Sequence, residues 1–282
     1  MIKKRSYSPN RKTLLALGGA IYNKENYASD MKISDLILKT DSLNFNVSKG
    51  TMAKYLNDEQ IEYLQKKTSE AIINKASLKS IYNELGYAYW ANLPGSLAEV
   101  RVLSKIIADC DTLTAKEINE KNIKELSNTG KLMDYKILHF STHGIGIPEI
   151  PELSAIILNP DDNTTEDGFL RMGEISELKL NADFVNLSAC ETGLGKIYSG
   201  EGVVGLSQAF IVAGANGISA SLWQVNDKST AQFMIDVFTL VKKENITYMQ
   251  AINKTKRLFI EGKHSNKWGT PYYWAPFIYY GN

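Results

Sequence analysis

The fold prediction rests mainly on the stretch DFVNLSACETG, residues 183–193. An apolar run rich in β-forming residues gives way to small residues, then to Cys190, Glu191 and glycine. This pattern is typical of a buried parallel strand that ends at the carboxyl edge of its sheet. In open α/β sheets that edge is where ligands bind and chemistry is done. We therefore expect Cys190 to lie at a functional edge.

A second run, YKILHFSTHG at residues 135–144, has the same design. Its apolar strand ends at His143, which is followed by Gly144. His143 and Cys190 are 47 positions apart, which leaves room for one intervening strand unit. Both strand ends are then expected at one edge of the sheet, with a thiol and an imidazole facing each other. The two runs together suggest a Cys–His dyad.

Predicted strands alternate with predicted helices along most of the chain. Strands are expected at 13–19, 111–114, 135–143, 155–158, 184–188 and 217–225, and helices at 95–107, 114–127, 174–178, 203–213, 228–242 and 247–261. Such alternation argues for an α/β fold with a doubly wound, mostly parallel sheet and helices on both faces. Along the helix that begins at Gly95 or Ser96, Glu99 and Arg101 are predicted to fall on the polar side.

The predicted domain organisation is simple. Residues 1–12 are basic and polar and are expected to form a flexible N-terminus, and residues 13–282 one domain. Residues 20–90 are interpreted as a helical insertion in that domain. Within it a long helix is predicted from Asp58 onward, with Asn57 or Asp58 as its cap.

Composition excludes several classes of function. The 282 residues carry 32 basic and 31 acidic side chains, a formal charge of +1, so nothing indicates a nucleic-acid or membrane surface. Two cysteines, Cys110 and Cys190, fit a reducing compartment, and Cys110 is placed near the end of a helix. The N-terminus has no apolar signal region, and the apolar segment 202–215 is too short to span a bilayer. These features predict a cytoplasmic protein.

A cysteine nucleophile needs a base to hold the thiolate and donors aimed at the oxyanion. His143 is placed to be the base, and the backbone amides of Gly144 and Cys190 are candidates for the donors, because glycine lets the main chain approach a substrate. A cysteine at a strand end is nevertheless more often structural. From the residues alone, both interpretations stay open.

Other uses of these residues are weaker. His139 lies inside the apolar part of its strand, where a satisfied core histidine is the preferred role. Three histidines and two cysteines without close pairs do not predict a metal site, and no cofactor is expected. The glycines at 193–195 and 200–202 match no dinucleotide or phosphate-loop pattern, which disfavours a nucleotide-binding domain and suits a mobile active-site loop.

Several motifs in sequence order carry a family resemblance. They are ILHFSTHG (137–144), VNLSACETGLG (185–195), GEGVVGLSQAF (200–210), AGA (213–215), ASLWQVND (220–227) and YYWAPF (272–277), with LPG (93–95) and Glu99 before them. Together they resemble the CHAT domain family, whose members are caspase-like, clan CD cysteine peptidases related in fold to caspases and separase. The match is dense over residues 93–282.

The resemblance implies roles for individual residues. His143 matches the family's catalytic histidine, Cys190 its nucleophile and Gly144 its oxyanion hole. Asp227 matches the segment that lines the S1 pocket in separase-like relatives, although a helix N-cap is at least as reasonable on sequence grounds. Trp223 is a pocket wall or a core aromatic. A further residue, Glu191, either orients the loop or meets substrate.

The resemblance also implies a function. The chain is expected to be a regulated cysteine endopeptidase that cleaves a protein or peptide substrate, with a third triad member neither evident nor implied. Family members often act in defence or cell-death systems, so a regulatory protein partner is expected as well, whereas nucleic acid and membrane are not. The alternative is a non-catalytic CHAT-like scaffold that binds a partner through the same cleft.

Overall fold

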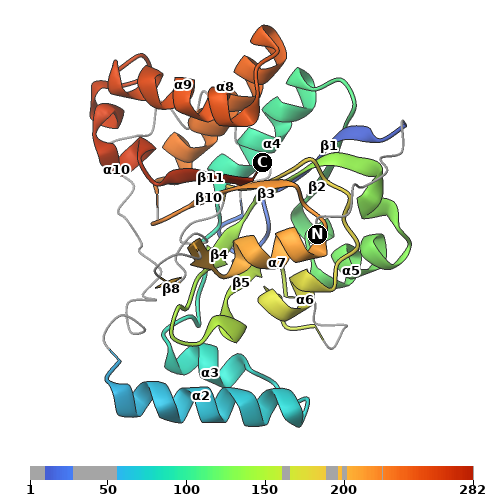
Figure 1. The fold of residues 1–282 in the computed structure, drawn as a ribbon, viewed down its shortest axis with the longest axis vertical. Helices are drawn as coiled ribbons and strands as arrows, with labels where there is room; N and C mark the ends of the chain where they lie inside the picture. The colour runs from blue at the N-terminus through green and yellow to red at the C-terminus, as the bar shows by residue number, and fades with distance from the viewer. Residues whose placement is uncertain are drawn as a thin grey trace.

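A computed structural model describes residues 10–27, 56–160, 166–188, 196–198, 202–223 and 225–281. Its main sheet has six strands in the order β11-β10-β7-β3-β1-β2 (Figure 1). These are β1 Lys12–Gly18, β2 Cys110–Thr114, β3 Tyr135–Ser141, β7 Phe184–Leu187, β10 Gly217–Ser221 and β11 Phe277–Gly281. All neighbouring pairs are parallel except β10–β11, which is antiparallel. The predicted α/β fold with a mostly parallel sheet is confirmed.

Helices cover both faces of this sheet. They are α4 Pro94–Ile106, α5 Glu120–Asn128, α6 Met172–Ser176, α7 Leu206–Ala213, α8 Asp227–Glu244, α9 Tyr248–Ile260 and α10 Pro271–Trp274. Alternate residues of β1 contact the helices on opposite faces of the sheet, because successive side chains of a strand point to opposite sides. Leu15 and Leu17 pack with residues of α5, α6 and α7, whereas Leu14 and Ala16 pack with residues of α4 and α8. Both faces are therefore apolar core.

A smaller antiparallel sheet continues from the end of β3. Its order is β4-β5-β6, with β4 His143–Ile145, β5 Ala155–Ile157 and β6 Phe169–Arg171. Helices α2 (Asp58–Ile73) and α3 (Lys79–Glu84) lie beside it at one end of the molecule (Figure 1). One apolar cluster joins Leu64, Ile81 and Tyr82 of these helices to the sheet. The chain before α4 thus supports the segment that begins at His143.

Two remaining strands form a hairpin, β8 Lys196–Tyr198 and β9 Gly202–Val204. Within the described residues, no helix is long and apolar enough to cross a membrane. The predicted helix at 58 begins as expected, with Asn57 as its cap in a capping box with Gln60.

Three local predictions need correction. Cys110 is the first residue of β2 and does not end a helix. The strand predicted at 155–158 belongs to the small sheet, because it pairs with the chain that follows β3. The helix predicted at 114–127 is divided into a 3₁₀ turn, Ala115–Glu117, and α5, since Asn119 caps a second start.

Candidate active site

The two strand ends identified from the sequence lie side by side. β3 and β7 are direct neighbours, and Ser188 N–H donates to the Phe140 carbonyl (2.9 Å) one residue beyond the end of β7. Cys190 and Glu191 are outside the described residues. Of the predicted dyad, the structure therefore describes His143, together with the strand that leads to Cys190.

The imidazole of His143 is held on three sides. It is only 5% exposed and lies against the rings of Tyr22 and Trp90, with centroids 4.8 and 5.0 Å away. Its Nε2 atom is 2.7 Å from the carbonyl oxygen of Ala91. A carbonyl oxygen only accepts, so Nε2 carries the proton and Nδ1 is the basic nitrogen. Among the described residues, no hydrogen bond to Nδ1 is found.

Burial determines the charge of this imidazole. Burial lowers the pKa of His143 to about 4, and the hydrogen bond to Ala91 offsets part of that shift. The ring is therefore neutral near pH 7, which is the form that accepts a proton. When the ring does accept one, the Ala91 carbonyl stabilises the imidazolium, because the hydrogen bond becomes charge-assisted.

Tyr22 fixes the backbone of the same residue. Its hydroxyl accepts the backbone N–H of His143 (3.1 Å) and donates to the Ile157 carbonyl (2.8 Å). The phenol thus bridges β4 and β5 at the point where the small sheet begins. Neighbouring Gly144 is buried in β4 opposite Ile156.

Ala91 is the group that sequence reasoning missed. Every residue has a carbonyl, so no residue type marks the one that orients a histidine. The nearest signal is the Leu93-Pro94 turn, since the residue before a proline is held extended or in a turn. That turn precedes α4 and directs the 90–92 segment past His143.

Asp227 lies at the first position of α8, but the cap of that helix is Asn226, whose side chain accepts from Lys228 and Ser229. The predicted cap role for Asp227 is therefore wrong. Its Oδ2 instead accepts the N–H of Gly95 (2.5 Å) at the start of α4.

Burial raises the pKa of Asp227 to about 7, with the nearby charge of Glu99 adding to the shift. The other predicted pocket residue, Trp223, is half-buried and donates its indole N–H to the Tyr272 carbonyl (3.1 Å). It packs at the edge of the apolar cluster formed by α8, α9 and β11.

Glu99 is 1% exposed, which contradicts its predicted place on the polar side of α4. Here α4 packs against both the sheet and α8. Arg101 is exposed, as predicted. A buried carboxylate requires donors, and these come from the two strands next to the site. We call the group the site cluster; it consists of Glu99, His139, Ser141, Asn186 and Ser188.

His139 is confirmed as a buried core histidine with a partner at each nitrogen. It is fully buried, with Nε2 2.6 Å from Glu99 Oε1 and Nδ1 2.7 Å from the side-chain nitrogen of Asn186. Since it is held on both sides, it does not compete with His143 as a free base.

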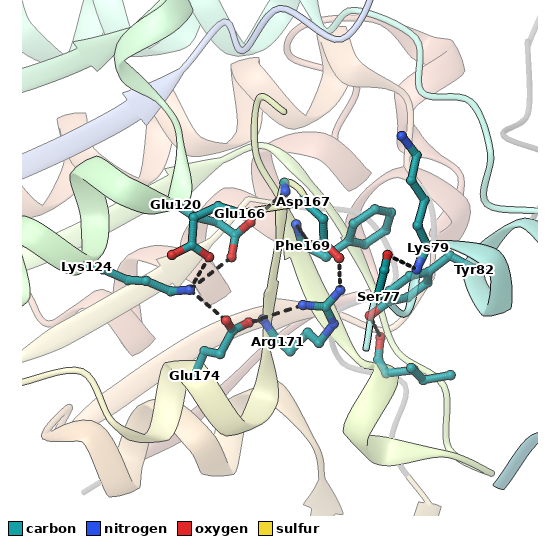
Figure 2. Close-up of polar contacts among 12 residues, drawn as sticks. Ser77, Lys79, Tyr82, Glu120, Lys124, Glu166, Asp167, Phe169, Arg171 and Glu174 are labelled. Atoms are coloured by element: carbon teal, nitrogen blue, oxygen red, sulfur yellow. Dashed lines mark hydrogen bonds and ion pairs between the residues drawn. The ribbon is translucent and has the colours of Figure 1, made fainter. Parts of the chain in front are cut away.

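A second group of charges, in which only Glu120 is fully buried, lies around α5 and α6 and is shown in Figure 2. We call it the lysine cluster; it consists of Lys124, Glu120, Glu166 and Glu174. The three carboxylates are close enough together to hold a cation. Lys124 Nζ already occupies that centre, 3.3 Å from Glu120, 2.5 Å from Glu166 and 2.7 Å from Glu174. We therefore assign no metal to this group.

The charged groups of the lysine cluster shift one another's pKa values. Burial raises the pKa of Glu120 to about 7, with the charge of Glu174 as the next cause. Burial opposes the charge of Lys124, but its hydrogen bonds with Glu166 and Glu174 leave its pKa raised. The cluster continues through Arg171, whose guanidinium pairs with Asp167 and lies over the ring of Tyr82 (Figure 2).

Known proteins give the following matches. A family model for the CHAT domain matches residues 20–282. No curated protein sequence matches the chain. The crystal structure of the Arg-specific cysteine proteinase gingipain R matches with 13% identity and a TM-score of 0.42, over 69% of this chain and 42% of that one. The complex of the pro- and mature domains of RgpB from Porphyromonas gingivalis matches with 12% identity and a TM-score of 0.42, over 69% and 43%. This chain thus spans less than half the length of either.

Proposed function

Because this chain belongs to the CHAT domain family, we propose that it is a cysteine endopeptidase in which His143 and Cys190 act as a catalytic dyad on a protein substrate. The observation that carries the proposal is the fixed tautomer of His143. Its Nε2 proton is committed to the Ala91 carbonyl, which leaves Nδ1 as the base. A buried histidine with only a packing role also needs an acceptor for its proton. His143 differs from the core histidine His139 in that no partner of Nδ1 is found among the described residues.

The proposed reaction proceeds through an acyl-enzyme. His143 Nδ1 takes the thiol proton of Cys190 as the sulfur attacks the substrate carbonyl. The amides of Gly144 and Cys190 hold the oxyanion. The imidazolium then protonates the leaving amine, and the neutral ring activates water to release the acid. The Ala91 carbonyl stabilises the imidazolium between the two transfers.

We extend the proposal to three residues on the substrate side. Trp223 would form a pocket wall, and Glu191 would meet substrate or orient its loop. Asp227 would act by holding the start of α8 against the start of α4, since its carboxylate accepts from Gly95. Regulation by a protein partner, in a defence or cell-death setting, is the remaining part of the proposal.

The test is mass spectrometry after incubation with a peptidyl acyloxymethyl ketone, comparing wild type with His143→Ala and Cys190→Ala. One adduct on Cys190, slowed by roughly 100-fold or more without His143, is the expected result. An adduct that forms equally fast without His143 would contradict the dyad. If Cys190→Ala retains the biological function, the scaffold alternative is correct.

A further inference from the structure

The carboxylate of Glu99 contacts the ends of both catalytic strands. Ser141 and Ser188 donate to the same oxygen, Oε2, at 2.8 and 3.4 Å. In the sequence, Ser141 stands two residues before His143, and Ser188 two residues before Cys190. One side chain of α4 thus touches the equivalent point on each of the two strands.

The other carboxylate oxygen reinforces this link. His139 Nε2 lies 2.6 Å from Oε1, and Asn186 donates to His139 Nδ1 (2.7 Å). His139 and Asn186 are opposite each other in the register of β3 and β7. Because the amide nitrogen donates, Nδ1 accepts and Nε2 carries the proton, beside the Glu99 carboxylate. The carboxylate therefore has directional donors from both strands.

The contact lies where the strand ladder ends. The register of β3 and β7 runs to Phe140 opposite Leu187. Ser141 and Ser188 follow directly after that pair. The serine hydroxyls hold the chains at this point, and both are at least nine-tenths buried, as is Glu99.

We propose that Glu99 is a positioning residue that sets the separation of the strand ends carrying His143 and Cys190. This inference rests on the proposed function. Misplacement of reacting groups by about 1 Å costs roughly 100-fold in rate. A carboxylate fixed by donors from both strands holds their separation within narrower limits than apolar packing, because hydrogen bonds are directional.

The experiment measures alkylation of Cys190 by iodoacetamide against pH, with each cysteine followed in its own peptide. Iodoacetamide requires no substrate pocket. Cys110 serves as an internal reference, because burial together with Asp111 and Asp109 raises its pKa to about 11. Burial alone lowers the pKa of His143 to about 4, but a thiolate beside the ring would stabilise the imidazolium and be stabilised by it. In wild type the rate at Cys190 is therefore expected to level off below the pKa of an ordinary thiol, about 8.5. His143→Ala should move the profile toward that ordinary value.

Glu99→Ala is expected to move the profile in the same direction as His143→Ala and to slow alkylation at neutral pH by roughly 100-fold. Glu99→Gln should restore most of the wild-type profile. Its amide nitrogen donates to serine hydroxyls that rotate to accept, and its amide oxygen takes the place of Oε1 beside His139. This rescue separates positioning from a requirement for charge.

Three serine variants keep the test decisive if Glu99→Ala does not fold. Ser141→Ala and Ser188→Ala each release one strand end and should each shift the profile by a smaller amount. Ser219→Ala is the matched control, since Ser219 is a buried serine of β10 opposite Asn186 for which no hydrogen bond to Glu99 is found among the described residues.

The outcomes separate the two proposals. If His143→Ala shifts the profile but Ser141→Ala, Ser188→Ala and the folded Glu99 variants behave like Ser219→Ala, the positioning role is overturned and the dyad stands. If His143→Ala itself retains the wild-type profile, the dyad is wrong and the positioning role falls with it.

Discussion

Two glutamates, Glu99 in α4 and Glu120 in α5, are each only 1% exposed. Around Glu99 two serine hydroxyls donate to Oε2, and the imidazole of His139 lies 2.6 Å from Oε1. Around Glu120 the partners are the backbone N–H of Gly168 (2.6 Å) and the ammonium of Lys124. The first carboxylate is surrounded by groups of fixed direction, and the second faces a compact cation.

This difference in partners indicates what the site cluster and the lysine cluster each contribute to the protein. Hydroxyl donors bind a carboxylate only in particular directions, so Ser141 and Ser188 define the position of the strands that carry them. A lysine ammonium is a flexible point charge that neutralises several carboxylates at once. We therefore expect changes in the site cluster to alter chemistry and changes in the lysine cluster to alter stability.

The largest stability effect is expected for Lys124→Met. Removal of the cation leaves Glu120, Glu166 and Glu174 facing one another, at a cost of about 3 kcal/mol in the free energy of unfolding. Urea unfolding measures this. The pH profile of Cys190 alkylation should stay that of wild type.

The matched control is Lys254→Met, which removes the lysine of an exposed pair with Glu244. Such surface pairs contribute at most about 1 kcal/mol. Equal losses for the two lysine variants would show that the lysine cluster has no special role in stability. A shifted alkylation profile in Lys124→Met would contradict the separation between the two clusters.

Glu120→Gln should change how stability depends on pH. The folded-state pKa of Glu120 is raised to about 7 by burial and by Glu174. A carboxyl whose pKa is raised on folding loses stability as pH rises through the interval between its unfolded and folded values. The Gln variant should therefore gain free energy of unfolding relative to wild type at about pH 8, and less or none at about pH 5.

Its amide oxygen can still accept from Gly168, so the hydrogen bond that holds the 168 turn is retained. Denaturant unfolding across this pH range is the measurement. If the free energy of unfolding of the variant differs from that of wild type by the same amount at all pH values, the raised pKa of Glu120 is not the cause.

Two tyrosine variants are expected to distinguish the site cluster from the lysine cluster, with smaller effects on stability. Tyr82 lies next to Arg171, through which the lysine cluster continues, and Tyr22 lies next to His143. The variants Tyr82→Phe and Tyr22→Phe each remove a hydroxyl that donates to a backbone carbonyl. Each should cost about 1–2 kcal/mol in the free energy of unfolding, because a buried carbonyl loses its donor. Only Tyr22→Phe should slow the alkylation of Cys190, since only Tyr22 binds the backbone of His143.

Equal alkylation rates in these two variants would mean that the Tyr22 bridge does not position His143. Tyr82→Phe is the stability control for this comparison, because both hydroxyls serve the same kind of acceptor.

For Asp227→Asn the expected change is in the pH dependence of stability. Burial raises the pKa of Asp227 to about 7, so wild-type stability falls as pH rises from the ordinary carboxyl value toward 7. The Asn variant should lose that fall while keeping the acceptor for Gly95. Asp58→Asn is the control, because Asp58 also follows an asparagine cap at the first position of a helix but is exposed. Melting temperature against pH should flatten for Asp227→Asn and not for Asp58→Asn.

Much of the fold was predictable because apolar runs of strand length alternate with helical patterns. The parallel sheet and the adjacency of the His143 and Cys190 strands followed from that alternation. The prediction that Glu99 lies on the polar side of its helix was wrong because helical periodicity assigns every carboxylate to the solvent-facing side. An acidic residue in an otherwise apolar stretch of α4 and His139 in an apolar strand were two separate anomalies in the sequence, and the structure pairs them.

The rest of the site could not be predicted for physical reasons. The Ala91 carbonyl has no residue type to mark it, and its approach to His143 depends on the path of the chain before α4. Asp227 looked like a local cap, yet its acceptor bond goes to a helix start more than a hundred residues earlier. The role of Cys190 stays a prediction that the labelling experiments address.

The strand order also determines how the chain acquires its structure during synthesis. β1, β2, β3 and β7 complete two thirds of the sheet before α8 has been made. Until then one face of α4 and the apolar positions Leu14 and Ala16 lack their cover from Phe238. We expect a nascent chain at that stage to expose this apolar surface after β3 and β7 have been made. The helix that closes this surface also carries Asp227, so completion of the fold and attachment of α8 to the start of α4 occur together.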